Sequence, residues 1–454
     1  HIAPMFFAHT GFVYSEEYPV MDIILNTMQN ISSGRQSMWW WGGIINDEQR
    51  ANLYLENHSF KTAISAREIK PEIFYELLKL KSKALRNYIN TQMPPKEFDD
   101  FLKAFSEKYN FTDIPFETFM QEFENQYGID LKPFINNWYT EEHSPTLFIK
   151  DVDANQVIVD EVTKYQIKFK VNNPSDVNGI ITVDIQQGGN FRGGPRGGGV
   201  PFSMRTNENT SEAYIIPAKQ AREIKIIVDE RPANVKINTN ISHNLPSSYT
   251  FNFPKIETIV SDTVAGTFPV NPDVFKPNPN EIIIDNEDRN FKTISSNNRH
   301  KLKDLFQKAD QEKYKNFNRW WQPSKWTAIA GDYCYGETTN SAVYKRKGSG
   351  NNSVQWTAEI PKSGYYEVSV WNAKQSIGRG PGRRREKEER NQTYTIQYGN
   401  EKESITLDLE QEDSGWMPWG NFYLSEGPVT ITLTDKVSGN YVIADAVKFT
   451  FINE

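Results

Sequence analysis

The histidines of this chain lack the spacing of a zinc peptidase site. That site needs two histidines four residues apart on a helix, so that both imidazoles reach one metal ion and an intervening glutamate activates its water. The histidines are His1, His9, His58, His143, His243 and His300, and no two have this spacing. No Gly-x-Ser-x-Gly nucleophile elbow occurs either. We therefore assign no catalytic residue, and zinc is expected only if a catalytic domain lies upstream.

Aromatic side chains near the C-terminus have the chemistry for binding sugars. Seven of the 11 tryptophans fall in the last 135 positions. Aromatic rings stack on the apolar C–H faces of sugars, while polar neighbours bind the hydroxyls. Trp356 and Trp371 alternate with strand neighbours, which predicts that both are buried. The candidate glycan-binding residues are Trp320, Trp321, Trp326, Tyr333, Tyr335, Trp416 and Trp419, the last two in a predicted turn.

Three carboxylates follow a short apolar run near residue 281. Calcium takes six to eight oxygen ligands, so Asp285, Glu287 and Asp288 are candidates for a structural calcium site. The alternative is an Asx turn with solvated charges. No other cofactor is indicated. The single cysteine, Cys334, excludes an intramolecular disulfide and is expected to be a packed structural thiol.

Charge and hydropathy exclude two classes of partner. The formal net charge is −7, which disfavours nucleic acid and anionic membrane surfaces. No run of 18 apolar residues occurs, so no transmembrane segment is predicted. A glycine-rich run over 188–199 and a basic run over 379–390 are both expected to be loops between strands.

The chain has 454 residues, enough for about three domains that each bury a core. Helical periodicity over 72–139 predicts four helices. The third has Asp113 as N-cap, Pro115 in its first turn and Gly128 at its end. From Pro145 onward the period changes to two, which predicts strands.

These patterns predict a multidomain α+β protein. The expected segments are a leader or upstream remnant over 1–64, a helical lobe over 65–143 and an Ig-like β-sandwich over 144–255. A proline-rich linker over 256–280 and a jelly-roll β-sandwich over 281–454 follow, the latter with a polar helix near 299–317.

Four stretches of the last domain follow the order found in a known family, namely 283–288 with Phe291, 354–368, 415–420 and 442–447. On these stretches, residues 281–454 resemble the golvesin C-terminal, or xanthan-lyase carbohydrate-binding-like, domain. The resemblance implies a β-sandwich appended to an exported bacterial enzyme, with suspected polysaccharide binding and a structural hydrogen-bonding role for Asp445. Asp262-Thr263-Val264 is similar to the O-glycosylation signal of exported Bacteroidetes proteins.

Residues 65–255 resemble the part of aminopeptidase N type zinc peptidases that follows the metal site. The similarity rests on 128–139 and on the entry to the sandwich at 144–147. The family's Tyr-x-Lys-Gly segment corresponds to 79–82, where Lys79 replaces the tyrosine. This resemblance implies a peptidase-like parent protein.

The leading hypothesis is a non-catalytic C-terminal portion of an exported peptidase-like protein, located in the periplasm or at a bacterial surface. Its β-sandwich would bind a polysaccharide or another cell-surface component. Two alternatives stay open. The chain is part of an active zinc metallopeptidase whose catalytic half lies upstream, or it is a structural subunit of a surface complex whose aromatic side chains bind protein partners.

Overall fold

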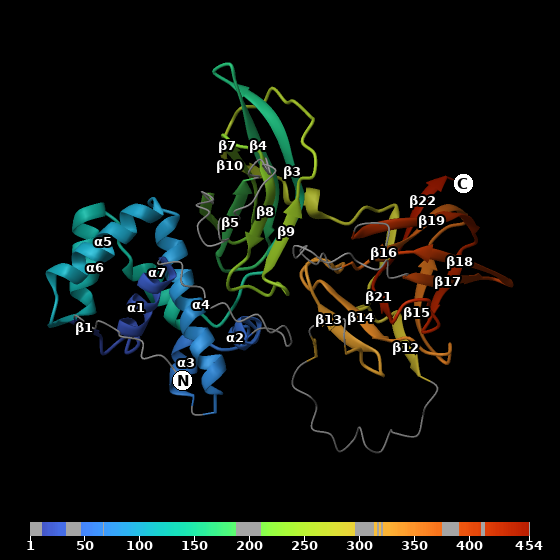
Figure 1. The fold of residues 1–454 in the computed structure, drawn as a ribbon, viewed down its shortest axis with the longest axis horizontal. Coiled ribbons are helices and arrows are strands. Elements are labelled where there is room, and N and C mark those ends of the chain that lie inside the picture. The colour runs from blue at the N-terminus through green and yellow to red at the C-terminus, as the bar shows by residue number, and fades with distance from the viewer. Residues whose placement is uncertain are drawn as a thin grey trace, which may run out of the picture. The chain divides into compact units, whose positions relative to one another are not determined.

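The computed structural model describes residues 11–32, 47–66, 68–187, 210–295, 313–315, 317–318, 321–374, 390–409 and 414–453. The chain forms two compact units, one built from residues up to 275 and the other from residues after it (Figure 1). A helical block and a β-sandwich make up the first unit, and a second β-sandwich makes up the other. The predicted α+β multidomain class is therefore confirmed. None of the helices in the described part of the chain combines the length and apolar character needed to cross a bilayer.

The helical block contains the four predicted helices. They are α4 (Pro71–Asn90), α5 (Pro95–Lys108), α6 (Phe116–Tyr127) and α7 (Lys132–Thr140). Phenylalanines on facing turns of α5 and α6 pack edge to face, and the ring centroids of Phe101 and Phe123 lie 5.2 Å apart. Gly128 ends α6 at φ +70°, a left-handed conformation that suits a residue without Cβ.

Two predictions about this block need correction. Residues 112–115 are not a helix start, because β2 (Thr112–Pro115) pairs in parallel with β1 (Gly11–Tyr14), and Asp113 is consequently not an N-cap. The described residues of the expected leader belong to the block itself, as α1 (Met21–Ser32), α2 (Asp47–Leu55) and α3 (Phe60–Ser65). The reason is the apolar face of these helices, since Met21, Ile24, Met28 and Phe60 are completely buried in the shared core.

The first sandwich packs two four-stranded sheets around a core of isoleucine and valine. One sheet has the order β10-β7-β4-β3, and the other has the order β6-β5-β8-β9. Its strands are β3 (Phe148–Val159), β4 (Val162–Asn173), β5 (Gly179–Gln187), β6 (Thr210–Ile216), β7 (Gln220–Val228), β8 (Pro232–Asn238) and β9 (Ser248–Asn252). A two-residue turn joins β3 to β4, and both Asp160 and Glu161 have the positive φ that tight hairpins require.

The predicted linker over 256–280 is partly a strand. β10 (Gly266–Val270) pairs with β7, and a short 3₁₀ helix over Pro272–Phe275 follows it. Pro269 fits there because β10 lies at the edge of its sheet, where a missing N–H breaks no ladder. Pro269 therefore belongs to an edge strand, whereas Pro272, Pro277 and Pro279 lie outside β10.

The second sandwich has sheets of four and five strands, ordered β11-β22-β16-β19 and β12-β15-β20-β17-β18. A third sheet, β13-β14-β21, covers a smaller second core. The strands are β11 (Glu281–Ile284), β12 (Phe291–Ser295), β13 (Thr327–Ala330), β14 (Ser341–Arg346), β15 (Asn352–Ile360), β16 (Gly364–Asn372), β17 (Asn391–Tyr398), β18 (Glu401–Asp408), β19 (Gly415–Leu424), β20 (Gly427–Thr434), β21 (Tyr441–Ala444) and β22 (Val447–Asn453).

Several predicted segments lie wholly or largely outside the described residues. The glycine-rich run over 188–199 is one of them, and most of the predicted helix near 299–317 is another. Of the basic run over 379–390, only Arg390 is described. Arg390 is not a solvated loop residue, because it is buried and its guanidinium donates to Asn372 Oδ1 at 3.0 Å.

Candidate functional site

The outer face of the sheet β11-β22-β16-β19 concentrates aromatic and polar side chains. Along β16, Tyr366, Val368 and Val370 point into the main core. Because side chains alternate across a strand, Tyr365, Glu367, Ser369 and Trp371 lie on the opposite side, which we call the outer face. The prediction that Trp356 is buried is confirmed. Trp371 is only partly buried and packs against the second core instead.

Two exposed tyrosines occupy one end of the outer face. Tyr365 and Tyr423 are direct cross-strand neighbours on β16 and β19. Their ring centroids lie 5.3 Å apart at an interplanar angle of 74°. Tyr365 is 46% exposed and Tyr423 is 53% exposed, although large aromatic side chains usually bury most of their surface. We call these two residues the tyrosine pair.

Three further rings form a cluster at the other end of the outer face. Trp371 and Trp416 are cross-strand neighbours with centroids 5.3 Å apart, and Tyr335 lies within 5.3 Å of both. The Lys448 ammonium sits 4.8 Å from the Trp416 ring centroid and 3.6 Å from a Glu281 carboxylate oxygen. One face of Trp416 is therefore covered by a cation that already has a carboxylate partner.

Polar side chains lie between the two aromatic ends. Glu367 is the cross-strand neighbour of Asn421 on β19 and of Thr450 on β22. Tyr365 and Trp371 are six residues apart on β16, which corresponds to about 20 Å of extended strand. The outer face therefore has exposed rings at one end, partly buried rings at the other end and hydrogen-bonding groups between them.

A β-bulge determines which tryptophan of β19 belongs to this face. Residues 415–424 are a strand, so the predicted turn at Trp416 and Trp419 is wrong. The register shifts between Val368 and Ser369, and the extra residue opposite them is Trp419. As a result Trp419 turns into the main core, where it contacts Phe422. Pro418 is tolerated because β19 lies at the sheet edge.

The other predicted glycan-binding residues are not brought together. Tyr333 packs into the second core, and burial raises the pKa of its hydroxyl far above the ordinary value. Trp326 packs against the main core, with the Lys345 ammonium 6.0 Å from its ring. Trp321 is 78% exposed, and Trp320 lies outside the described residues. Among the members of the predicted set that the structure describes, Tyr335 and Trp416 are the pair in ring contact.

Sequence reasoning missed Tyr365, Tyr423 and Lys448. The doublet Tyr365-Tyr366 carried a usable signal, because consecutive residues of a strand point to opposite faces and one ring must leave the core. Nothing local signals the approach of Lys448 to Trp416, since the two residues lie on strands separated by β16.

The three predicted calcium ligands are held by protein groups. Asp288 Oδ2 accepts from the Asp285 backbone N–H at 2.7 Å, and the Asp288 backbone N–H donates to the Asp285 carbonyl at 3.1 Å, so a backbone-closed turn stands where an Asx turn was predicted. Glu287 accepts from Ser341 Oγ at 2.7 Å and pairs with Lys313. Burial alone would raise the pKa of Glu287, but these two partners outweigh burial and lower the pKa overall. Burial raises the pKa of Asp285 to about 7. No group of three His, Cys, Asp or Glu side chains that could hold a metal occurs among the described residues, so the calcium prediction gains no support there.

Asp445 connects the loop that carries Tyr335 to the sandwich. Its Oδ2 accepts from the Tyr335 backbone N–H at 3.0 Å, and its backbone oxygen accepts from Trp356 Nε1 at 2.8 Å. The structural hydrogen-bonding role implied for Asp445 is therefore present. Cys334 is buried beside it, and burial raises the pKa of the thiol well above its usual range, as expected for a packed structural thiol.

Comparisons with known proteins give a family match for the second sandwich. Residues 307–451 match the family model described as the Golvesin C-terminal domain. None of the curated proteins matches the chain. Among solved structures, a Paenibacillus xanthan lyase aligns at 14% identity and a TM-score of 0.27, covering 68% of this chain and 25% of the lyase. The chain thus spans about a quarter of that enzyme.

Two further solved structures align with similarly low scores. A family 35 carbohydrate-binding module from Clostridium thermocellum aligns at 15% identity and a TM-score of 0.20, covering 29% of this chain and 90% of the module. An exo-β-1,3-galactanase from Phanerochaete chrysosporium aligns at 11% identity and a TM-score of 0.24, with 68% of each chain covered. The firm similarity is that of residues 307–451, and the C-terminal unit is a β-sandwich similar to the Golvesin C-terminal domain.

Proposed function

We propose that the C-terminal unit binds a polysaccharide along the outer face of the sheet β11-β22-β16-β19. The observation that carries this proposal is the tyrosine pair, in which two neighbouring rings are each about half exposed. An exposed ring offers an apolar surface to the C–H face of a sugar at little conformational cost, because tyrosine has only two side-chain torsions to fix. The match of residues 307–451 to the Golvesin C-terminal domain supports the proposal, since polysaccharide binding is suspected for that family.

The middle of the outer face favours a neutral glycan. Lys448 is the cation of this face, and its charge is already matched by Glu281 at 3.6 Å. Glu367 has no cationic partner among the described residues, so it would repel a uronate while accepting hydrogen bonds from sugar hydroxyls. The spacing of the two aromatic ends suits an extended chain of several sugar units rather than one sugar.

The location of the protein and the nature of its parent protein belong to the same proposal. A glycan-binding sandwich would hold the protein on a polysaccharide outside the cytoplasm, which agrees with the prediction of an exported protein. The predicted peptidase-like parent stays a prediction, as do the alternatives of an active upstream zinc domain and of a structural subunit.

Replacing both Tyr365 and Tyr423 with alanine in the full chain should weaken glycan binding at least about tenfold, because exposed aromatic anchors carry a large share of binding energy. Affinity electrophoresis through gels containing hydroxyethyl cellulose, β-mannan, xylan or β-1,3-glucan measures this effect. Both side chains are exposed, so the fold should tolerate the change.

A matched control is available in the helical block. Tyr75 is 57% exposed and has the Lys79 ammonium 4.6 Å from its ring, so Tyr75→Ala removes a comparable ring away from the outer face. It should leave gel retardation unchanged. Carboxymethyl cellulose, which shares a backbone with hydroxyethyl cellulose, should retard the protein less. Equal retardation of the double variant and the unmodified protein, or no retardation by any polysaccharide, would show that the outer face is not a glycan site.

A further inference from the structure

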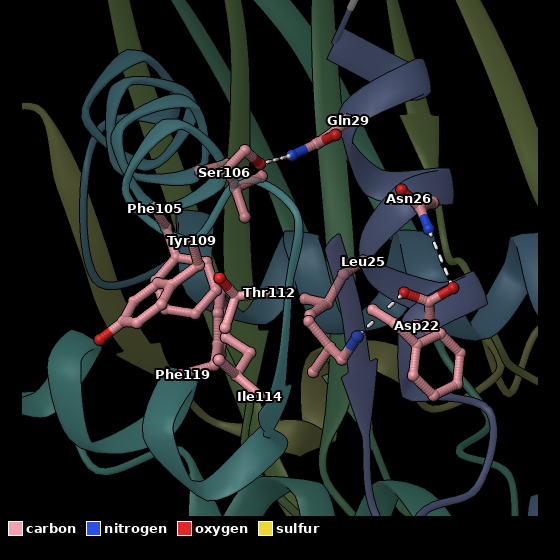
Figure 2. Close-up of a pocket in the computed structure, with 13 residues that line it drawn as sticks. Asp22, Leu25, Asn26, Gln29, Phe105, Ser106, Tyr109, Thr112, Ile114 and Phe119 are labelled. Carbon is pink, nitrogen blue, oxygen red and sulfur yellow. Dashed lines mark hydrogen bonds between the residues drawn. The ribbon is translucent and has the colours of Figure 1, made fainter. Parts of the chain in front are cut away.

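A cavity of about 100 Å³ lies inside the helical block, far in sequence from the outer face. It is lined by residues of α1, α5, α6 and the paired strands β1 and β2 (Figure 2). Phe12 belongs to its wall and is 48% exposed, so the cavity reaches solvent beside this ring.

The two sides of the cavity differ in chemistry. Figure 2 shows Phe105 and Phe119 on the side of α5 and α6, where they supply an apolar wall together with Leu102. Asp22, Asn26 and Gln29 line the opposite side from successive turns of α1. A ligand that fits both walls must have an apolar body and one polar end.

Asp22 is the single charged side chain among the residues that line the cavity. Its Oδ1 accepts from the Val13 backbone N–H and its Oδ2 accepts from Asn26 Nδ2, both at 3.2 Å. These are long bonds from neutral donors, and no described residue forms an ion pair with this carboxylate. A carboxylate has about four acceptor sites, so half of its capacity is free.

We propose that this cavity binds a short primary alkylamine, with the ammonium on Asp22 and the methylenes against Leu25, Phe105 and Phe119. An ammonium has three donors and no acceptor, which matches the acceptor-only Asp22 carboxylate. The volume limits the ligand: a void of about 150 Å³ holds benzene, so one of about 100 Å³ suits a chain of four or five heavy atoms. A lysine side chain ends in this group, and so does a free small amine.

The test uses n-butylamine, n-butanol and Nα-acetyl-lysine methylamide with the full chain at pH 7.4, followed by saturation-transfer NMR. We expect n-butylamine to bind with a dissociation constant in the millimolar range and n-butanol at least about tenfold more weakly, because only the amine meets the Asp22 charge. Asp22→Asn should remove this preference. Binding of the lysine derivative as well would identify a side chain of a partner as the source, and its failure would identify a free amine.

Asp113→Asn is the matched control, because Asp113 is an exposed carboxylate on β2 that does not line the cavity. It should leave amine binding unchanged. Far-UV circular dichroism of both variants verifies that the helices are intact. Equal binding of n-butanol and n-butylamine, retention of the preference in Asp22→Asn, or no binding of the amine would each overturn the proposal. The glycan proposal rests on the other unit and would be unaffected.

Discussion

Asp435→Ala should lower the free energy of unfolding of the C-terminal unit by about 3–5 kcal/mol, because it leaves the Lys345 ammonium buried without a counter-charge. Asp435 is completely buried directly after β20, and its Oδ2 lies 2.6 Å from Lys345 Nζ. The same carboxylate accepts from the Gly350 backbone N–H and from Asn352 Nδ2, both at 2.7 Å. One side chain therefore joins β14, the following turn and the start of β15.

Hydrogen exchange followed by mass spectrometry on the full chain measures this loss in peptides that cover β14 and β20, since a chain of two units does not unfold in one step. The matched control is Asp100→Ala. Lys96 and Asp100 are also 2.6 Å apart, but both side chains are mostly exposed, so this change should cost less than about 1 kcal/mol.

Combining Asp435→Leu with Lys345→Met should recover part of the stability, because two apolar side chains need no counter-charge, while the Gly350 N–H and Asn352 Nδ2 still lose their acceptor. Equal protection of these peptides in Asp435→Ala and in the unmodified protein would contradict the assignment of this pair as a buried ionic link.

The strands around this pair were predictable, but the pair was not. The period of two that begins at Pro145 predicted strands in this part of the chain, and β14 and β20 are two of them. Lys345 and Asp435 are 90 residues apart, and each looks like an ordinary surface charge in its local pattern. Only the pairing of β14 with β21 and the packing of the sheets bring them together. The periodicity of a sequence does not identify ion-pair partners that are distant from each other in the chain.

The candidate site shows the same limit for a different reason. Residue composition drew attention to the C-terminal rings, and Trp416 lies on the outer face. One extra residue at the bulge turns Trp419 into the core, although Trp419 is only three positions from Trp416. A shift of one residue reverses the face of every following side chain, so an unrecognised bulge misplaces half of a predicted surface. Pro418 was the residue in the sequence that could have indicated an edge strand with a bulge.

Lys81→Met should stabilise the helical block at pH 6.5 by about 3 kcal/mol. Lys81 is buried in α4, and burial lowers the pKa of its ammonium from 10.5 to about 7. Burial thus disfavours the charged form in the folded state by several kcal/mol, roughly 4–5 from the lowered pKa, while losing the Nζ hydrogen bond to the Trp138 carbonyl at 2.6 Å costs about 1–2 kcal/mol. Methionine has a similar length and needs no counter-charge or hydrogen-bond partner.

The same pKa difference predicts how stability depends on pH. Between about pH 7 and 10.5 the unfolded chain keeps the Lys81 proton that the folded chain has released, so unfolding takes up a proton and stability rises with pH by up to about 1.4 kcal/mol per unit. Urea unfolding followed at 222 nm reports on this block, because every α-helix that the structure describes lies within residues 21–140. Lys79→Met is the control, since the Lys79 side chain is 42% exposed and pairs with Glu76. If the increase of stability with pH persists unchanged in Lys81→Met, another group causes it. If the increase is lost in Lys81→Met and retained in Lys79→Met, the buried amine of Lys81 causes it.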